Sequence, residues 1–132
     1  MRMRALIGLL LLAGCSGERQ FSGVETQGGA GVNVFPEKYR EEILAYQRSF
    51  LNDPTGIRTA GISQPALRKV GSVERYVVCV RFNAKGPGGG YVGEREHLAI
   101  FLAGKLDQMG VTRELCKDAA YEPFPELERL AR

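Results

Sequence analysis

The amino terminus of this chain constrains its fold most, because it has the layout of a segment that is removed. Arg2 and Arg4 give a positive start, and an apolar run from Ala5 to Leu12 follows without interruption. This run is far shorter than the ~20 residues that span a bilayer as a helix. Charged, apolar and small-residue regions in that order are typical of a secretory signal peptide. We therefore predict a signal peptide over residues 1–14 and one small domain from the rest.

The end of this leader, Leu12-Ala13-Gly14-Cys15, resembles the lipobox of bacterial lipoproteins. The resemblance implies cleavage before Cys15, a thioether-linked diacylglycerol on its sulfur and acylation of its amine. It also implies attachment to a membrane through this lipid. Ser16 after the cysteine implies the outer membrane, with the domain facing the periplasm; the inner membrane and surface exposure are alternatives. The competing interpretations are an ordinary signal peptide and a buried N-terminal strand, with Cys15 incidental in both.

The two remaining cysteines, Cys79 and Cys116, form an even pair in a chain exported to an oxidising compartment. We predict a disulfide between them, and two buried free thiols are the alternative. In the chain-entropy model, closing such a loop stabilises the fold by roughly 3–4 kcal/mol. Neither cysteine lies in a CxxC motif or beside a histidine, so we expect no metal and no cofactor.

Charge argues against a nucleic-acid partner. The formal net charge is +3, and two of the cations, Arg2 and Arg4, leave with the leader. The remaining domain is close to neutral and lacks the concentrated basic face that binds nucleic acid.

A flexible tether is predicted over residues 15–34. This stretch is rich in Gly, Ser and Gln and has no sustained apolar period. It would span roughly 25 Å on average and hold a domain of residues 35–132 clear of the lipid.

An amphipathic helix is predicted from Pro36 to Asn52. Pro36 suits a first turn, and Asp53-Pro54 ends the helix. Gln47 falls on the polar side. The apolar side repeats at three- and four-residue steps and consists of Tyr39, Ile43, Tyr46 and Phe50.

Beyond Asp53 the pattern becomes that of strands. Between Glu74 and Asn83, Tyr76 and every second residue after it fall on one face, and Cys79 falls on the other. We predict an α+β fold, with the N-terminal amphipathic helix packed on a four-stranded antiparallel β-meander. The first strand, Ile57–Val70, consists of two short extended pieces interrupted by Ser63-Gln64-Pro65, and Pro65 places it at an edge or a bulge. The other three strands are Glu74–Asn83, Tyr91–Leu102 and Leu106–Val111.

The predicted disulfide requires the C-terminal segment to cross the face of the sheet that carries Cys79. We expect a turn at 114–119 and a short helical end at 126–132. The stiff strip from Tyr121 to Leu127 would hold the segment on the sheet, or alternatively dock a partner. The side chains expected to cover this face are Ala119, Ala120, Tyr121 and Phe124.

No catalytic motif is present in the sequence, and we predict that the protein is not an enzyme. The Gly86–Gly90 run joins two strand patterns and lacks GK[ST], so we interpret it as a hairpin tip rather than a phosphate loop. His97 is the one histidine, and no serine lies in a GxSxG elbow. We interpret His97 as a polar strand residue; a hydrolase built around it is a competing hypothesis.

A cluster of charges is expected across the central hairpin. Glu94, Arg95 and Glu96 would face Arg75 and Arg81 and form weak cross-strand pairs. The alternative is a partner-binding patch, whose members would be Arg75, Arg81, Glu94, Arg95, Glu96 and His97.

Three segments resemble small uncharacterised lipoproteins of alphaproteobacteria: ERYVVCVRFNAK, YVGEREHLAIFLAGKLDQ and AAYEPFPEL. Together with Cys116 they extend the resemblance over about Tyr39 to Leu127. It implies the same fold and location and no particular activity. Lipid anchor, tether and disulfide favour a non-catalytic adaptor or assembly module that binds another envelope component. The alternative is an inhibitor or small-ligand binder acting through the Gly86–Gly90 loop or the edge strand near Pro65.

Overall fold

The computed structural model describes residues 33–112 and 114–131. The predicted signal peptide, Cys15 and nearly all of the predicted tether therefore lie outside the described residues. Along the described chain, one helix precedes five strands, and a short strand and a single helical turn follow. These elements are α2 (Tyr39–Phe50), β1 (Asp53–Ile62), β2 (Ala66–Val70), β3 (Val73–Lys85), β4 (Tyr91–Leu102), β5 (Lys105–Val111), β6 (Glu122–Pro123) and α3 (Pro125–Glu128).

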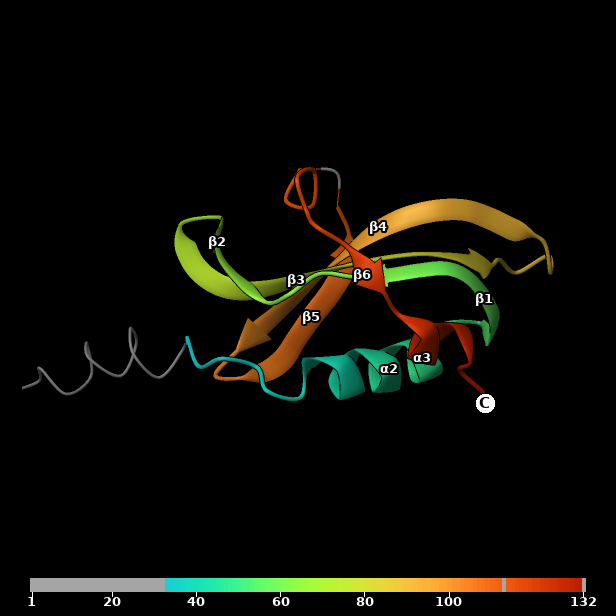
Figure 1. The fold of residues 1–132 in the computed structure, drawn as a ribbon, viewed down its shortest axis with the longest axis horizontal. Coiled ribbons are helices and arrows are strands. Elements are labelled where there is room, and N and C mark those ends of the chain that lie inside the picture. Colours follow the sequence, from blue (N-terminus) through green and yellow to red (C-terminus); the bar gives the residue numbers. More distant parts are fainter. Residues whose placement is uncertain (1–32, 113, 132) are drawn as a thin grey trace, which may run out of the picture.

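The six strands form one antiparallel sheet, in which five follow the order β5-β4-β3-β1-β6 and β2 pairs with β3 outside that order (Figure 1). β1 and β2 pair with the same strand, one after the other: β1 pairs with the second half of β3 and β2 with the first half. Both α2 and α3 lie below the sheet in Figure 1. Among the described residues, no helix combines the length and the apolar character that crossing a membrane requires.

The predicted fold class is wrong, because the molecule is mostly antiparallel β-sheet of six strands with one short helix rather than α+β with four strands. Pro65 has no N–H to donate, and the first predicted strand is split there into β1 and β2. The strip around Phe124 forms a further strand, because its extended backbone pairs with β1 and the Phe124 N–H donates to the Ala60 carbonyl at 2.9 Å.

The helix is present where the pattern predicted one, but it exposes different residues. Gln47, expected on the polar side, is 1% exposed, whereas Phe50, expected in the apolar stripe, is 68% exposed. The cause is β5, which α2 packs against. The amide nitrogen of Gln47 lies 3.3 Å from the Met109 sulfur, and the Tyr46 hydroxyl donates to the Met109 carbonyl at 3.4 Å. Polar helix side chains therefore face the edge of this strand.

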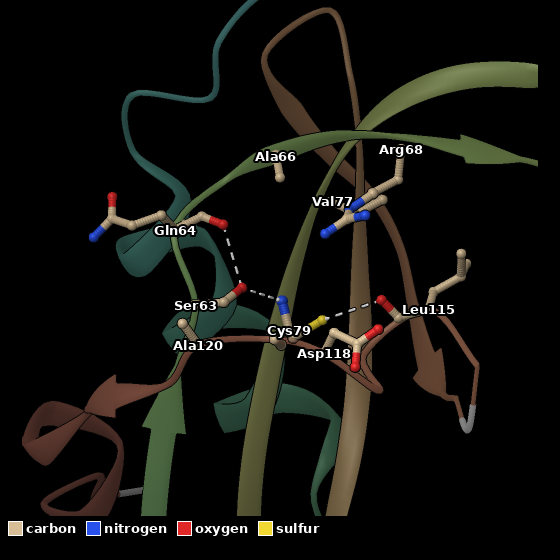
Figure 2. Close-up of a pocket in the computed structure, with 10 residues that line it drawn as sticks. Ser63, Gln64, Ala66, Arg68, Val77, Cys79, Leu115, Asp118 and Ala120 are labelled. Atoms are coloured by element: carbon tan, nitrogen blue, oxygen red, sulfur yellow. Dashed lines mark hydrogen bonds between the residues drawn. The ribbon is translucent and has the colours of Figure 1, made fainter.

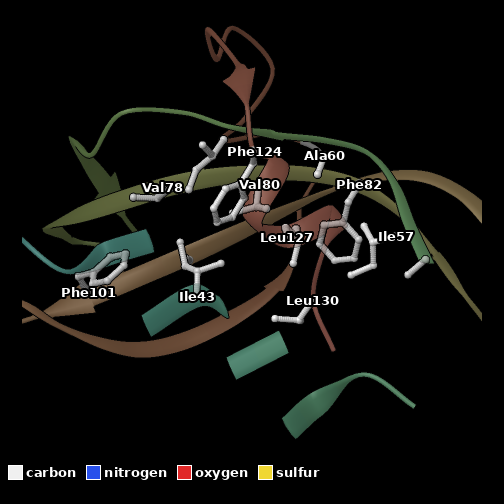
Figure 3. Packing of buried hydrophobic residues seen from close by; sticks show 13 residues of the cluster. Ile43, Ile57, Ala60, Val78, Val80, Phe82, Phe101, Phe124, Leu127 and Leu130 are labelled. Atoms are coloured by element: carbon white, nitrogen blue, oxygen red, sulfur yellow. The ribbon is translucent and has the colours of Figure 1, made fainter. Parts of the chain in front are cut away.

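The main core lies between the sheet and the two helices (Figure 3). Val78, Val80 and Phe82 alternate into it from β3, as the strand pattern predicted. Ile43 enters from α2 and Leu127 from α3. Phe124 also lies in this core and not on the disulfide face where we expected it. It directly follows β6, which pairs with β1 at the edge of the sheet, and its side chain packs on the helix side. The other members are Ile57, Ala60, Ile62, Ala84, Ala99, Phe101 and Leu130.

Candidate functional site

The opposite face of the sheet carries a smaller apolar cluster built around the predicted disulfide. Cys79 of β3 is bonded to Cys116, and their Cα atoms are 5.7 Å apart. The two cysteines pack with Val77 and Leu98, and Ala119 and Tyr121 lie against them. The disulfide is confirmed, and so is the prediction that the C-terminal segment crosses this face. Ala120, also expected to cover it, is exposed.

A groove of about 260 Å³ lies beside the disulfide (Figure 2). Arg68 lines it from β2, and Asp118 lines it from the loop that the disulfide holds. Within the part of the chain that the structure describes, neither side chain forms an ion pair or a hydrogen bond. Opposite charges are thus present in one groove without being paired to each other. Its remaining lining residues are Ser63, Gln64, Ala66, Val77, Cys79, Leu115, Ala119 and Ala120.

Ser63 fixes the floor of this groove where β1 ends. Its hydroxyl accepts the Cys79 N–H at 2.8 Å and donates to the Gln64 carbonyl at 3.3 Å. Its own N–H donates to the Cys79 carbonyl at 2.9 Å. The side chain therefore continues the pairing with β3 just before Pro65 interrupts it, and its proton is already donated.

A second polar cluster lies on the same face, between the central strands and the C-terminal segment. Arg81 Nε is 3.0 Å from Glu94 Oε1, and the Arg81 guanidinium lies 4.4 Å from the centre of the Tyr121 ring. The Tyr121 hydroxyl donates to Glu96 Oε2 at 2.6 Å. Burial, and then this bond to a carboxylate, raise the pKa of Tyr121 well above its usual range. The phenol thus stays protonated and holds the segment to β4.

The remaining predicted patch residues lie elsewhere. Arg95 is paired in register with Phe82, and alternation directs it toward the helix side of the sheet. Arg75 lies opposite Arg68 on β2 rather than opposite the carboxylates. The structure therefore brings together Arg81, Glu94 and Glu96, and places Arg75, Arg95 and His97 apart from them.

His97 also belongs to the helix side. Its ring stacks on Phe82 with centroids 4.4 Å apart and planes at 10°. Burial lowers its pKa, so the imidazole is neutral at neutral pH. Its Nδ1 is buried without a hydrogen-bond partner. This position supports the interpretation of His97 as a strand residue in a structural role.

Sequence reasoning missed the groove residues Arg68 and Asp118 and the role of Tyr121. Arg68 lies in the second of the two extended pieces expected on either side of Pro65, but nothing in the pattern placed its side chain in a groove. For Asp118 the available signal was its place two residues after Cys116, inside the segment that the disulfide would fix. Strand alternation alone could have separated Glu96 from His97, because neighbours along a strand point to opposite faces.

The described residues provide no obvious metal site: across 33–112 and 114–131, no three His, Cys, Asp or Glu side chains are grouped to bind an ion. No protein-family model matches the chain, and no curated protein or solved structure is measurably similar to it.

Proposed function

We propose that the protein is a lipid-anchored module of the bacterial cell envelope that binds another envelope component and catalyses no reaction. The observation that carries the proposal is the groove beside the disulfide. Arg68 and Asp118 line it with opposite charges that pair with nothing else in the described domain. Charges left unpaired in this way can be matched by a partner, which gives specificity as well as attraction.

The location follows from the leader and the disulfide together. The lipobox-like Leu12-Ala13-Gly14-Cys15 supports a lipid at Cys15, and Ser16 supports the outer membrane with the domain in the periplasm. A buried disulfide supports an oxidising compartment, because thiols are kept reduced in the cytosol. We propose no nucleic-acid partner, since the domain without its leader is close to neutral.

A non-catalytic role is supported by the positions of Ser63, the hydroxyl in the groove, and His97, the one histidine of the sequence. The Ser63 hydroxyl already donates to a backbone carbonyl, and His97 lies on the other face of the sheet against Phe82. A general base must reach the proton that it removes. These two side chains do not meet.

Photo-crosslinking in cells tests the proposal. A photoreactive amino acid in place of Ala120, which is exposed and lines the groove, should capture one partner reproducibly, and charge reversal by Arg68→Glu in the same protein should abolish the product. The matched control is the same amino acid in place of Glu41, which is exposed on α2. Absence of a product at position 120, or the same products at both positions, would contradict the proposal.

A second candidate function is inhibition of an enzyme through the β3–β4 loop. This loop is held by two backbone hydrogen bonds, from the Gly86 N–H to the Gly90 carbonyl at 2.8 Å and from the Gly89 N–H to the Gly86 carbonyl at 3.0 Å. A pre-organised loop is what an inhibitor needs to enter a cleft. The wild-type protein should then slow lysozymes or proteases, and Gly88→Trp, which adds a side chain in open space, should not. Equal rates with and without the protein would remove this candidate.

A further inference from the structure

The end of the sheet from which the chain runs toward its amino terminus is a distinct surface. Here the β4–β5 turn lies beside residues 33–36, and the β2–β3 turn lies at the same end of the molecule, on the left in Figure 1. The Phe35 ring packs edge-on against Tyr76 with centroids 5.5 Å apart. Val34 lies so close to Gly104 that a Cβ there would be 3.2 Å from it. We call this region, residues 33–36, 66–75 and 102–106, the tether end.

Exposed apolar side chains gather at the tether end. Five of the eight large apolar side chains exposed among the described residues belong to it. An apolar side chain exposed singly is ordinary, but several at one end indicate a contact surface. The five are Val34, Phe35, Leu67, Val73 and Leu102, whereas Phe50, Val92 and Val111 lie outside it.

The tether end is also basic. Its residues include the cations Arg68, Lys69, Arg75 and Lys105 and a single carboxylate, Glu74. Arg68 and Arg75 are direct cross-strand partners. Like charges directly opposite on two strands destabilise the pair. An anion close to both would relieve that repulsion.

Apolar side chains surrounded by cations fit the interface of an anionic bilayer. The apolar side chains enter the boundary of the acyl chains, and the cations contact the lipid phosphate groups. We propose that the tether end rests on anionic lipid headgroups, with Phe35 and Leu67 inserted. This rests on the lipid anchor of the proposed function. A lipid at Cys15 followed by the predicted tether would keep this end at an average distance of roughly 25 Å from the membrane. Contacts that are too weak to bind a free domain to the membrane can then hold the tethered domain there, because the tether keeps the local lipid concentration high.

The test couples the chain from Cys15 onward to vesicles through its own thiol. Cys79 and Cys116 are bonded, so Cys15 is the one thiol left to react with a maleimide lipid. Backbone hydrogen exchange is then compared on vesicles with and without phosphatidylglycerol. On anionic vesicles we expect exchange to slow about tenfold in residues 33–36, 66–75 and 102–106, with little change in α2.

Variants identify the source of this protection. Lys69→Glu with Lys105→Glu changes exposed side chains and should abolish it, as should Phe35→Ser with Leu67→Ser. The matched control, Phe50→Ser with Val111→Ser, removes two apolar side chains that are even more exposed but lie outside the tether end, and should retain the protection.

Two results would overturn the inference. One is equal exchange on both kinds of vesicle. The other is protection without vesicles that grows with protein concentration, since a second copy would then cover this end. Because the coupling is chemical, neither result depends on whether cells lipidate Cys15, so failure of the anchor itself is detected separately.

Discussion

Glu96 and His97 are neighbours in the chain but have opposite environments. Glu96 accepts a hydrogen bond from Tyr121 on the disulfide face, while His97 is half-buried against Phe82 on the helix face. Successive strand residues point to opposite faces, so a run of polar residues in a strand does not make one polar surface. The charged run of β4 therefore contributes to two different regions of the molecule.

Burial of His97 should make stability depend on pH. Its pKa is lowered in the folded protein, so below about pH 6.5 the unfolded chain takes up a proton that the folded chain resists. The free energy of unfolding should therefore fall from about pH 7 toward about pH 5 more steeply in the wild type than in His97→Gln. Denaturant titrations at several pH values measure this difference. Parallel curves for the two proteins would contradict it.

Ala103 should be a site where stability can be gained. It occupies the β4–β5 turn with φ 52°, next to Gly104 with φ 79°. Both residues thus lie in the left-handed region, which an Asn-Gly pair adopts most readily. Ala103→Asn should raise the free energy of unfolding by about 1 kcal/mol, and Ala103→Val should lower it. A melting temperature for Ala103→Asn at or below that of the wild type would show that the turn is not strained.

At the scale of elements, the two edges of the sheet are covered differently. On one side β5 is covered by α2, where Glu42 Oε1 accepts the Leu106 N–H at 3.3 Å. On the other side β6 pairs with two residues of β1, and within the described chain β2 pairs with β3 alone. An uncovered strand edge can pair with a strand of another chain, and exposed cations such as Lys69 disfavour that pairing. The break at Pro65 thus leaves a short, charged strand beside the groove.

Ser63 joins these elements, and its loss should be costly. Ser63→Ala removes the acceptor of the buried Cys79 N–H. An unsatisfied buried donor costs about 1–3 kcal/mol. The matched control is Ser72→Ala, which changes an exposed turn residue and should alter stability by less than about 0.5 kcal/mol. Similar denaturation midpoints for the two variants would show that Ser63 does not support the sheet.

Sequence patterns could predict the elements with strong periodicity and could not predict how they pair. Alternation placed Val78 and Cys79 on opposite faces, and the spacing of Ile43 placed a helix against the sheet. The strip around Phe124 was expected to be stiff and to lie on the sheet, but its pairing with β1 as a further strand was not predicted. Gln47 was misplaced because its burial depends on Met109, which is distant in sequence. The groove depends on three segments that only the fold brings together.

At the scale of the whole molecule, two apolar clusters lie on opposite faces of a single sheet. The larger one needs both helices, whereas the smaller one depends on Cys79–Cys116 to hold a loop with little secondary structure of its own. The groove borders only the smaller cluster. The geometry of the groove therefore depends on the disulfide, whereas the packing of the larger cluster does not include it.

Reduction of the disulfide should lower stability and loosen the loop beside the groove, while the packing of the larger cluster remains native. The free energy of unfolding should fall by about 3–4 kcal/mol, a large share of what a small domain has. Hydrogen exchange should accelerate most in residues 114–120, while α2 and the helix face of β3 stay protected under native conditions. Unchanged stability after reduction would contradict the role assigned to the bond.

Intact-mass analysis of the protein purified from its native membranes tests the lipid-anchored envelope assignment most directly. The predicted species begins at Cys15, carries a diacylglycerol and an amide-linked acyl chain, and lacks two hydrogens because Cys79 and Cys116 are joined. A species that retains Met1, or one with three unmodified thiols, would contradict it.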